Sequence, residues 1–431
     1  MKNLIWFRND LRVQDNTSLF KAMSGENVIA YFCFESVYFE KDIFGFQRTE
    51  KYRAKFLIET VTQLKHELEK LNIPLFVYYG KSDYFLPKLI EEHDINTVFL
   101  QKEWTRDENQ VLDSVRNKVQ PTVSFIETYD QFLFHPEDIP YPSFSSIPQV
   151  YTNFRKKCEK QTEVRQLTTI EDKLPKANLV SNSSQIPTLT DLGLEDFETD
   201  ARSAFPFFGG ESEALGRIDH YFWESKKLAY YKKTRNGLVG LDYSSKLSPW
   251  LANGSISPRT IYWEVKRFEK EVKKNQDTYW LIFELIWRDY FKYVSLKQGE
   301  KLFSIGGILN KEYVWKSSNA AKTEWIHGTT KQPFINANMK ELANTGWMSN
   351  RGRQNVASFW AKELQQDWRI GAAYFESLLL DYDVHSNWGN WMYNSGVGND
   401  PRDRKFNIKS QAERYDGNGK FQNLWLQETL F

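Results

Sequence analysis

The chain has 431 residues and a mass of 51.0 kDa, which is enough for two domains with substantial cores. Its formal net charge of +1 excludes a global basic field, and its two cysteines, Cys33 and Cys158, exclude a disulfide framework and a cysteine-rich zinc site. The sequence shows neither a secretory signal pattern nor a long apolar span, which predicts a soluble cytoplasmic protein.

The first third alternates short apolar runs with amphipathic stretches. Five runs have the length and composition of strands: 3–7, 28–34, 75–79, 97–101 and 123–127. Between the second and third run, 52–71 has apolar residues at helical spacing. This alternation predicts an α/β domain with a doubly wound, Rossmann-like parallel sheet. Ligands of such sheets bind beyond the carboxyl ends of the strands, which makes 8–15 and 102–107 the candidate binding loops.

Both candidate loops contain distinctive residues. The first, WFRNDLRVQDN, is interpreted as a polar turn in which Asp15 or Asn16 caps the following helix. In the second, Glu103 is either a surface carboxylate or a group that holds a ligand, and the sequence leaves both open. No G-x-G-x-x-G follows the first strand and no P-loop motif occurs, so an ordinary dehydrogenase or P-loop ATPase is disfavoured.

The middle of the chain, 131–208, loses this periodicity. Seven prolines and the polar run NSSQIPTLTDLG indicate a connector that lies over the surface between two domains. Short helices are expected within it, for example around 147–160. From Gly209 onward the pattern is helical almost throughout.

Two stretches of the helical half carry polar groups at positions that suggest either helix capping and ion pairing or ligand binding. In SSKLS, the hydroxyls of Ser244, Ser245 and Ser248 stand at a loop-to-helix junction, where they either cap the helix or cradle a phosphate. In the apolar helix 280–294, Glu284 and Arg288 lie four residues apart on one face, beside Trp287. The pair is either a buried ion pair or the polar lining of a cavity.

Acids, amides, indoles and glycines concentrate between 367 and 407, which suggests a site rather than a core. Asp381, Asp383, His385 and Asn387 are poor candidates for a metal site, because an EF-hand-type loop needs further oxygen ligands at fixed spacing. A hydrolytic carboxylate pair would need a nucleophile set that does not accompany it. Amides and indoles with few histidines suit recognition of a flat heteroaromatic ring.

Six motifs together resemble the photolyase/cryptochrome family: WFRNDLRVQDN, SSKLSPWLANGSISPR, ELIWRDYF, TGWMSNRGRQ, DWRIGAAYFESLLLDYDVHSNWGNW and GVGNDPRDRKFNI. They occur in the family's order and span nearly the whole chain. Gln354 and Tyr393 stand where bacterial cyclobutane-dimer photolyases of the familiar class have Met and Trp. Together with GVGNDPRDRKFNI, these two residues resemble the cryptochrome-DASH branch.

The resemblance implies an α/β antenna domain at 1–130, an interdomain linker at 131–208 and an all-helical catalytic domain at 209–431 that holds FAD. The residues that match the family's FAD contacts are Tyr231, Ser244, Ser245, Leu247, Ser248, Glu284, Arg288, Asn350, Arg353, Asp381, Asp383 and Asn387. Asn387 matches the residue opposite flavin N5, and Arg353 the arginine that pairs with Asp381. Glu103 matches the carboxylate that holds the pterin of a 5,10-methenyltetrahydrofolate antenna, although a deazaflavin or an empty site stays open.

Catalytic and substrate residues follow from the same resemblance. The implied catalytic set joins the tryptophan relay, which runs from flavin to surface, to two polar residues: Trp391, Trp368, Trp315, Asn387 and Glu284. The implied DNA contacts are Trp287, Asn350, Arg351, Gln354, Tyr393 and Arg402. Trp287 and Tyr393 would wall a slot for a flipped-out pyrimidine dimer. Arg351, Arg402, Arg404 and Lys405 are either phosphate contacts or solvated charges.

The leading hypothesis is light-driven repair of cyclobutane pyrimidine dimers, mainly in single-stranded or loop DNA, by a monomer with reduced FAD. The alternative is a blue-light receptor with a nucleic-acid or protein partner, and a third class is a non-catalytic single-strand binder. The chain stops at QETLF without a long low-complexity tail, which favours repair over signalling. Repair of (6-4) photoproducts is disfavoured, because NRGRQNVASF lacks the histidine that related enzymes use.

Overall fold

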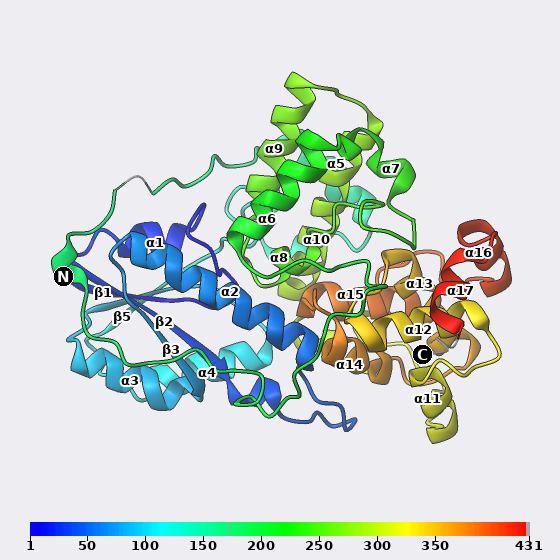
Figure 1. Cartoon of the computed structure of the whole chain (residues 1–431), viewed down its shortest axis with the longest axis horizontal. Helices are drawn as coiled ribbons and strands as arrows, with labels where there is room; N and C mark the ends of the chain where they lie inside the picture. Colours follow the sequence, from blue (N-terminus) through cyan, green and yellow to red (C-terminus); the bar gives the residue numbers. More distant parts are fainter. Residues whose placement is uncertain (171, 428–431) are drawn as a thin grey trace.

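The structure is a computed structural model that describes residues 1–170 and 172–427, so most of the terminal QETLF lies outside the described residues. An α/β domain and a helical domain lie side by side (Figure 1). The first contains a five-stranded parallel sheet with the order β3-β2-β1-β4-β5. The predicted fold class is therefore confirmed, whereas the domain limits at 130 and 209 stay predictions.

The sheet follows the predicted strands to within one residue at each end: β1 (Lys2–Trp6), β2 (Asn27–Glu35), β3 (Leu75–Gly80), β4 (Thr97–Gln101) and β5 (Ser124–Thr128). Its helices are α1 (Thr17–Ala22), α2 (Lys51–Lys70), α3 (Ser82–Glu92) and α4 (Arg106–Arg116). Alternate residues of β1 enter opposite layers: Leu4 packs with residues of α3 and α4, and Ile5 with residues of α1 and α2. The predicted cap of α1 is Asn16, whose side chain accepts from the N–H of Leu19 at 2.9 Å.

The connector crosses from the helical domain to the far end of the sheet and returns along the α/β domain (Figure 1). It contains α5 (Tyr151–Gln161), close to the helix predicted at 147–160. The N–H of Val77 in β3 donates to Ser184 Oγ at 2.9 Å, and Asn182 donates to the carbonyl of Leu75 at 2.6 Å. The connector therefore satisfies polar groups of an edge strand that would otherwise be open to pairing.

The helical domain is assembled around one long helix. Its elements are α6 (Glu211–Ile218), α7 (Tyr231–Thr234), α8 (Ser248–Ala252), α9 (Pro258–Glu271), α10 (Gln276–Gln298), α11 (Asn319–Ile326), α12 (Pro333–Thr345), α13 (Asn350–Ser358), α14 (Trp368–Leu378), α15 (Val384–Ser395), α16 (Ile408–Tyr415) and α17 (Lys420–Leu426). Asn275 caps α10, which packs against α5, α7, α9 and α15. Of the helices that the structure describes, none is long and apolar enough to cross a lipid bilayer.

A buried ionic cluster joins the two domains. Arg259, in the first turn of α9, lies 2.8 Å from Asp15 Oδ1 and 3.0 Å from Asp130 Oδ1, and all three side chains are at most 4% exposed. Burial alone would raise the pKa of Asp130, but Arg12 and Arg259 outweigh it and hold that pKa below its usual range. The cluster fixes the start of α9 against the carboxyl ends of the strands.

A second buried carboxylate ties the connector to α10 and gives stability a pH dependence. Asp289 accepts the N–H groups of Leu133 and Phe134 at 3.0 and 2.8 Å, and burial raises its pKa from 3.8 to about 7. Its pKa is higher in the folded than in the unfolded state, so its contribution is complete below pH 3.8 and is lost as the pH rises to about 7. We expect Asp289→Asn to make the fall of the unfolding midpoint between those pH values less steep, while other buried carboxylates with a raised pKa, such as Glu211, still contribute to it; a slope equal to that of the wild type would contradict it.

Candidate cofactor and substrate site

An arginine of α13 and an aspartate before α15 form the first part of the site. Arg353 Nη2 lies 2.9 Å from Asp381 Oδ1, and Arg353 Nε donates to the carbonyl of Met348 at 2.9 Å. The side chain of Asp381 is 4% exposed. The pair implied by the family motif is thus present, and it places a charge-assisted contact between α13 and the loop that leads to α15.

Asp383 fixes the start of α15. Its Oδ1 accepts the N–H of Ser386 at 2.8 Å as an N-cap, and its Oδ2 lies 2.8 Å from Lys292 Nζ on α10. Burial opposes ionisation, but Lys292, His385 and Arg288 outweigh it and hold the pKa of Asp383 well below its usual range. Asp383 is therefore an ionised support of the helix that carries Asn387 and Trp391. Lys292 was missed in the sequence, where it is one of four charged residues in the apolar stretch 280–294.

Asn387 and Trp391 both face α14. Asn387 is buried and donates to the carbonyl of Ala372 at 2.9 Å. Trp391 is 2% exposed and packs so closely that a Cβ added to Gly371 would lie 2.2 Å from its ring. A glycine is therefore required at that point of α14, because any side chain would displace the indole.

The three relay tryptophans lie in one part of the helical domain, but their ring contacts run to other aromatic groups. Trp391 packs edge-on against Phe375 at 5.0 Å, and Trp315 packs edge-on against Tyr313 at 5.5 Å. Trp368, the first residue of α14, is 5.7 Å from Trp388. Trp391 and Trp368 are buried, and Trp315 is half-buried. The relay itself stays a prediction.

Of the two interpretations of Glu284 and Arg288, the buried ion pair between them is wrong. Glu284 pairs instead with Arg235, at 3.0 Å, and burial raises the pKa of Glu284 while Arg235 opposes that rise. Arg288 points the other way and donates to the carbonyls of Gln131 and Leu251. The i,i+4 spacing did not bring the two side chains together, because each one reaches a partner from another segment.

The serines before α8 do not cap it, so the capping interpretation is wrong. The N-cap of α8 is Leu247, which has no side-chain cap bond. Arg217 of α6 holds the preceding loop by donating to the carbonyls of Ser245 and Ser244 at 3.0 and 3.1 Å. Tyr231, Ser245 and Leu247 are buried, whereas Ser248 is exposed.

Of the predicted slot residues, Tyr393 lies against Trp287. Tyr393 meets Trp287 edge-to-face, with ring centroids 5.9 Å apart and an interplanar angle of 89°. One face of Trp287 is covered by Tyr151 of α5, with centroids 3.6 Å apart and planes 12° apart. Tyr151 was missed because nothing in the connector sequence signals contact with α10. Gln354 is half-buried and Asn350 exposed on the first turns of α13.

The arginines assigned to DNA have mixed surroundings. Arg351 donates to Asn236 at 3.2 Å and lies over the ring of Tyr415 at 4.6 Å, on a different face of α13 from Arg353. Arg404 donates to the hydroxyl of Tyr393 at 3.0 Å and therefore orients that ring. Arg402 and Lys405 are exposed.

A cavity of about 730 Å³ lies between the two domains. Its lining includes Asn9, Gln101 and Glu103 from the α/β domain and Lys292 and Asp383 from the helical domain. Glu103 is 6% exposed and accepts from Gln101 at 2.8 Å and from Asn9 at 3.3 Å. Burial raises its pKa against the opposing charges of Arg8 and Lys292. The interpretation of Glu103 as a surface carboxylate is therefore wrong.

Comparisons with known proteins agree with this geometry. The model of the DNA photolyase family matches residues 3–176, and that of the FAD binding domain of DNA photolyase matches 280–430. Cryptochrome DASH of Xenopus laevis is 45% identical over 98% of this chain and 82% of its own length. The chain belongs to the photolyase/cryptochrome family.

Solved structures of this family superpose over nearly the whole chain. The crystal structure of a Synechocystis cryptochrome has a TM-score of 0.94 and 42% identity, covering 99% of this chain and 89% of that one. A class III photolyase from Agrobacterium tumefaciens has a TM-score of 0.81 and 25% identity, covering 99% of this chain and 86% of that one. The branch predicted from Gln354 and Tyr393 is confirmed, because relatives at this level of identity are named cryptochrome DASH.

The residues present fit the FAD that this photolyase/cryptochrome domain binds. Within the described residues, the buried Lys246 Nζ, Trp280 Nε1 and Trp391 Nε1 have no hydrogen-bond partner. Such donors suit a ligand with phosphates and ring acceptors, because buried polar groups are normally satisfied. FAD is therefore the cofactor, and the serine loop, the Arg353–Asp381 pair and α15 are the elements that would hold it.

Proposed function

We propose that the protein repairs cyclobutane pyrimidine dimers in single-stranded DNA in a light-dependent reaction. The observation that carries this proposal is the edge-to-face arrangement of Trp287 and Tyr393, at 5.9 Å and 89°. Two aromatic walls at a right angle suit a flipped-out dimer, which presents ring faces to one wall and edges to the other. Glu284, on the turn of α10 before Trp287, is the hydrogen-bond partner for the carbonyls and imides of the dimer.

The chemistry that bound FAD would supply is a light-driven, reversible transfer of one electron to the dimer, with no net redox change. The residues of the chain itself bind the dimer and orient it and the flavin. Glu284 holds a proton more readily than an exposed carboxylate, since burial raises its pKa, and can donate it in a hydrogen bond to a dimer carbonyl. The ionised Asp383 fixes α15 and thereby Asn387, whose amide would meet the flavin edge. Trp391, Trp368 and Trp315 would replace electrons lost from the flavin.

Preference for single strands follows from the residues of the slot. Tyr393 offers less stacking surface than an indole, and Gln354 makes the slot more polar. The energy gained on stacking is then too small to extract a paired dimer from a duplex, which costs a few kcal/mol. Arg404 donates to the hydroxyl of Tyr393 and so fixes the orientation of this ring. The ring can then receive a base of a single strand.

The direct test is illumination of the reduced protein with dimer-containing oligothymidylate. We expect loss of dimers in the light and none in the dark, and we expect Trp287→Ala to slow the loss by weakening stacking worth about 1–3 kcal/mol. Dimer content would be followed by the return of thymine absorbance. Unchanged dimers under light, with the flavin verified as reduced, would refute the proposed reaction.

The relatives' name favours a second candidate, a blue-light receptor that binds a nucleic acid or a protein without repairing it. In that function the tryptophan relay is essential, because light must reduce an oxidised flavin. Repair by an already reduced flavin does not need the relay. Substitution of Trp391 therefore separates the two functions.

We also propose that the cavity between the domains binds 5,10-methenyltetrahydrofolate as an antenna. Support comes from the buried Glu103, whose carboxylate can accept from the pterin ring, and from the neighbouring amides of Asn9 and Gln101. We expect Glu103→Gln to remove the folate absorbance from the purified protein while the flavin content stays the same. Glu127→Gln, at a carboxylate paired with Arg116 on the surface, is the matched control. Equal folate content in both variants would contradict the assignment.

A further inference from the structure

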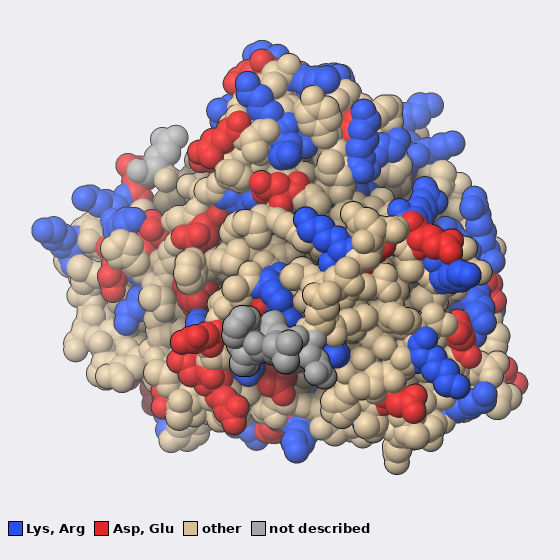
Figure 2. Space-filling view, turned by 45° about the vertical axis from the view of Figure 1, so that its right-hand side comes forward, with Lys and Arg blue, Asp and Glu red and all other residues tan. Residues whose placement is uncertain are grey.

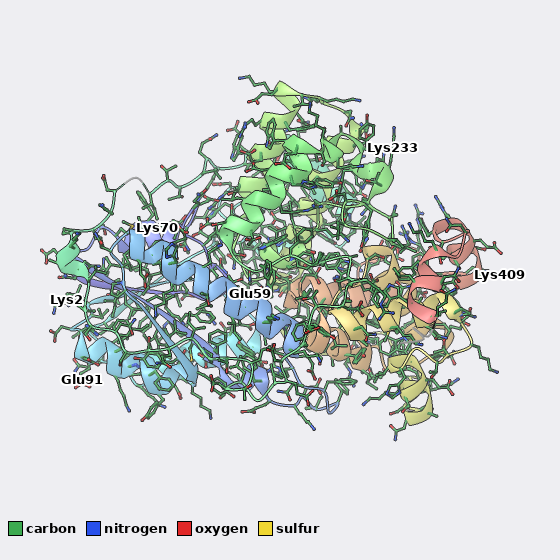
Figure 3. All side chains as sticks on the ribbon, viewed as in Figure 1. Lys2, Glu59, Lys70, Glu91, Lys233 and Lys409 are labelled. Carbon is green, nitrogen blue, oxygen red and sulfur yellow. The ribbon has the colours of Figure 1, made fainter. Side chains whose placement is uncertain are left out.

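A basic and aromatic surface lies next to the slot, over α7 and the end of α9. We call it the α7 patch and define it by seven exposed residues: Lys226, Lys227, Tyr230, Lys232, Lys233, Lys273 and Lys274. In Figure 2, many Lys and Arg side chains lie along the upper and right-hand parts of the view, with some Asp and Glu among them. Lys233 lies at the outer side of α7, far from Lys2 and Glu91 at the other end of the molecule (Figure 3). The patch is thus a feature of the helical domain.

The positive charge of the patch is local and largely uncompensated. Residues 226–235 contain five basic residues and no acidic one, in a chain whose net charge is only +1. Glu271, at the end of α9, pairs with Arg267 at 3.4 Å, and Asp277 accepts from the backbone N–H of Lys233 at 3.2 Å. Among the described residues, no side-chain ion pair involves a lysine of the patch. Lysines left without acidic partners attract a polyanion, and they release its counterions when it binds.

Aromatic rings lie among these lysines, as they do in proteins that bind single strands. Tyr230 is 50% exposed, and Lys273 Nζ lies 5.6 Å from its ring centroid. Lys232 Nζ lies 4.2 Å from the ring of the half-buried Trp280. An exposed ring flanked by ammonium groups offers one base a stacking surface and its phosphates a charge.

Two contacts make the patch continuous with the slot. Arg235, one residue beyond α7, pairs with Glu284 at 3.0 Å, and the next residue, Asn236, accepts from Arg351 at 3.2 Å. Within α7 itself, Tyr231 turns inward and is buried, whereas Lys232 and Lys233 turn outward. A strand that leaves the slot past Glu284 therefore meets the lysines of α7 next.

We propose that the α7 patch binds the single-stranded DNA that flanks the lesion, so that the substrate is a strand held well beyond the dimer. This proposal rests on the proposed function for the slot, and it adds the path and the length of the bound strand. It also explains how a slot with weak stacking retains its substrate: the lysines supply affinity that does not depend on the lesion.

The test compares oligothymidylates of about 5 and about 16 nucleotides, each with one dimer, and an undamaged strand of the longer length. The variant replaces Lys226, Lys227, Lys232 and Lys233 with Gln. We expect it to bind both long strands about tenfold more weakly and to lower the slope of log affinity against log salt by about 2 to 3, at about 0.7 per lost contact. Affinity for the short strand and the flavin spectrum should not change.

The matched control replaces four exposed lysines of the α/β domain with Gln: Lys21, Lys70, Lys88 and Lys118. It should bind every strand as the wild type does. Equal salt slopes for the α7 variant and the wild type on the undamaged strand would overturn the proposal, whether or not repair occurs. Displacement of the long strand by polyglutamate at the same charge concentration would overturn it too, since the patch would then serve an acidic protein. If the short strand did not bind to the wild type, the proposed binding of the dimer between Trp287 and Tyr393 would be wrong, but the proposal for the α7 patch would not be affected.

Discussion

Replacing Arg259 with leucine will destabilise the protein by about 3–5 kcal/mol, because it leaves the carboxylates of Asp15 and Asp130 buried without their ion-pair partner, with Arg12 as the remaining neighbouring cation. Both lie within 3.0 Å of the guanidinium, in the contact between the domains. We expect the midpoint of denaturant unfolding to fall. We also expect the α/β domain and the helical domain to unfold at different denaturant concentrations, because the contact between them is weaker. The shift should be followed with one probe in each domain, since a two-domain chain need not unfold in one step.

The control for this prediction lies on the same helix. Arg267 pairs with Glu264 and Glu271 on the surface of α9, where its side chain is 53% exposed. Arg267→Leu should cost no more than about 1 kcal/mol, the usual range for exposed pairs. The difference between the variants should also shrink at low pH, where Asp130 becomes protonated and no longer needs a cation. Equal midpoints for the two variants would show that the cluster contributes little.

Trp391→Phe will abolish the light-driven reduction of oxidised flavin while leaving repair by chemically reduced protein unchanged. Trp391 is 2% exposed and is held against Gly371, so phenylalanine fits the space but oxidises far less readily than an indole. Photoreduction would be followed by bleaching of the flavin absorbance under blue light with an external reductant. Trp250→Phe, at an equally buried indole of the domain contact, should behave like the wild type.

Both halves of this result are informative. Unimpaired photoreduction in Trp391→Phe would contradict its place in the relay. Lost repair in the chemically reduced variant, with flavin retained, would show that Trp391 acts in repair itself. A receptor without repair activity would lose its light response and show no dimer splitting in either form.

Regular elements could be predicted from the sequence because their signals are local. The strands follow a period of two and are bounded by turn residues, and Asn16 caps α1 through its own side chain. Pairings across the helical domain could not be predicted in the same way. Glu284 had two cations within reach, and only the folded chain shows that Arg235 is chosen over Arg288. The family motifs supplied the Arg353–Asp381 pair, which spacing alone would not.

Residues that complete the site without belonging to a motif were the hardest to find. Tyr151 lies in the connector, more than a hundred positions from Trp287, and its stacking depends on how α5 crosses α10. The serine loop was assigned correctly as a junction, but the cap it suggested is absent because Arg217 organises the loop through its carbonyls. Side chains that act on backbone groups of distant segments leave no periodic trace in a sequence.

Lys292 links Asp383 of the helical domain to Glu103 in the cavity between the domains. Its ammonium is bound to Asp383 at 2.8 Å, lies 5.9 Å from the ring centroid of Trp104, and also acts on the carboxylate of Glu103. Asp383 and Glu103 thus share Lys292 as a counter-ion, while Arg288 also acts on Asp383 and Arg8 also acts on Glu103. A substitution that changes the charge at Asp383 must therefore also alter the electrostatic field at Glu103, across the domain boundary.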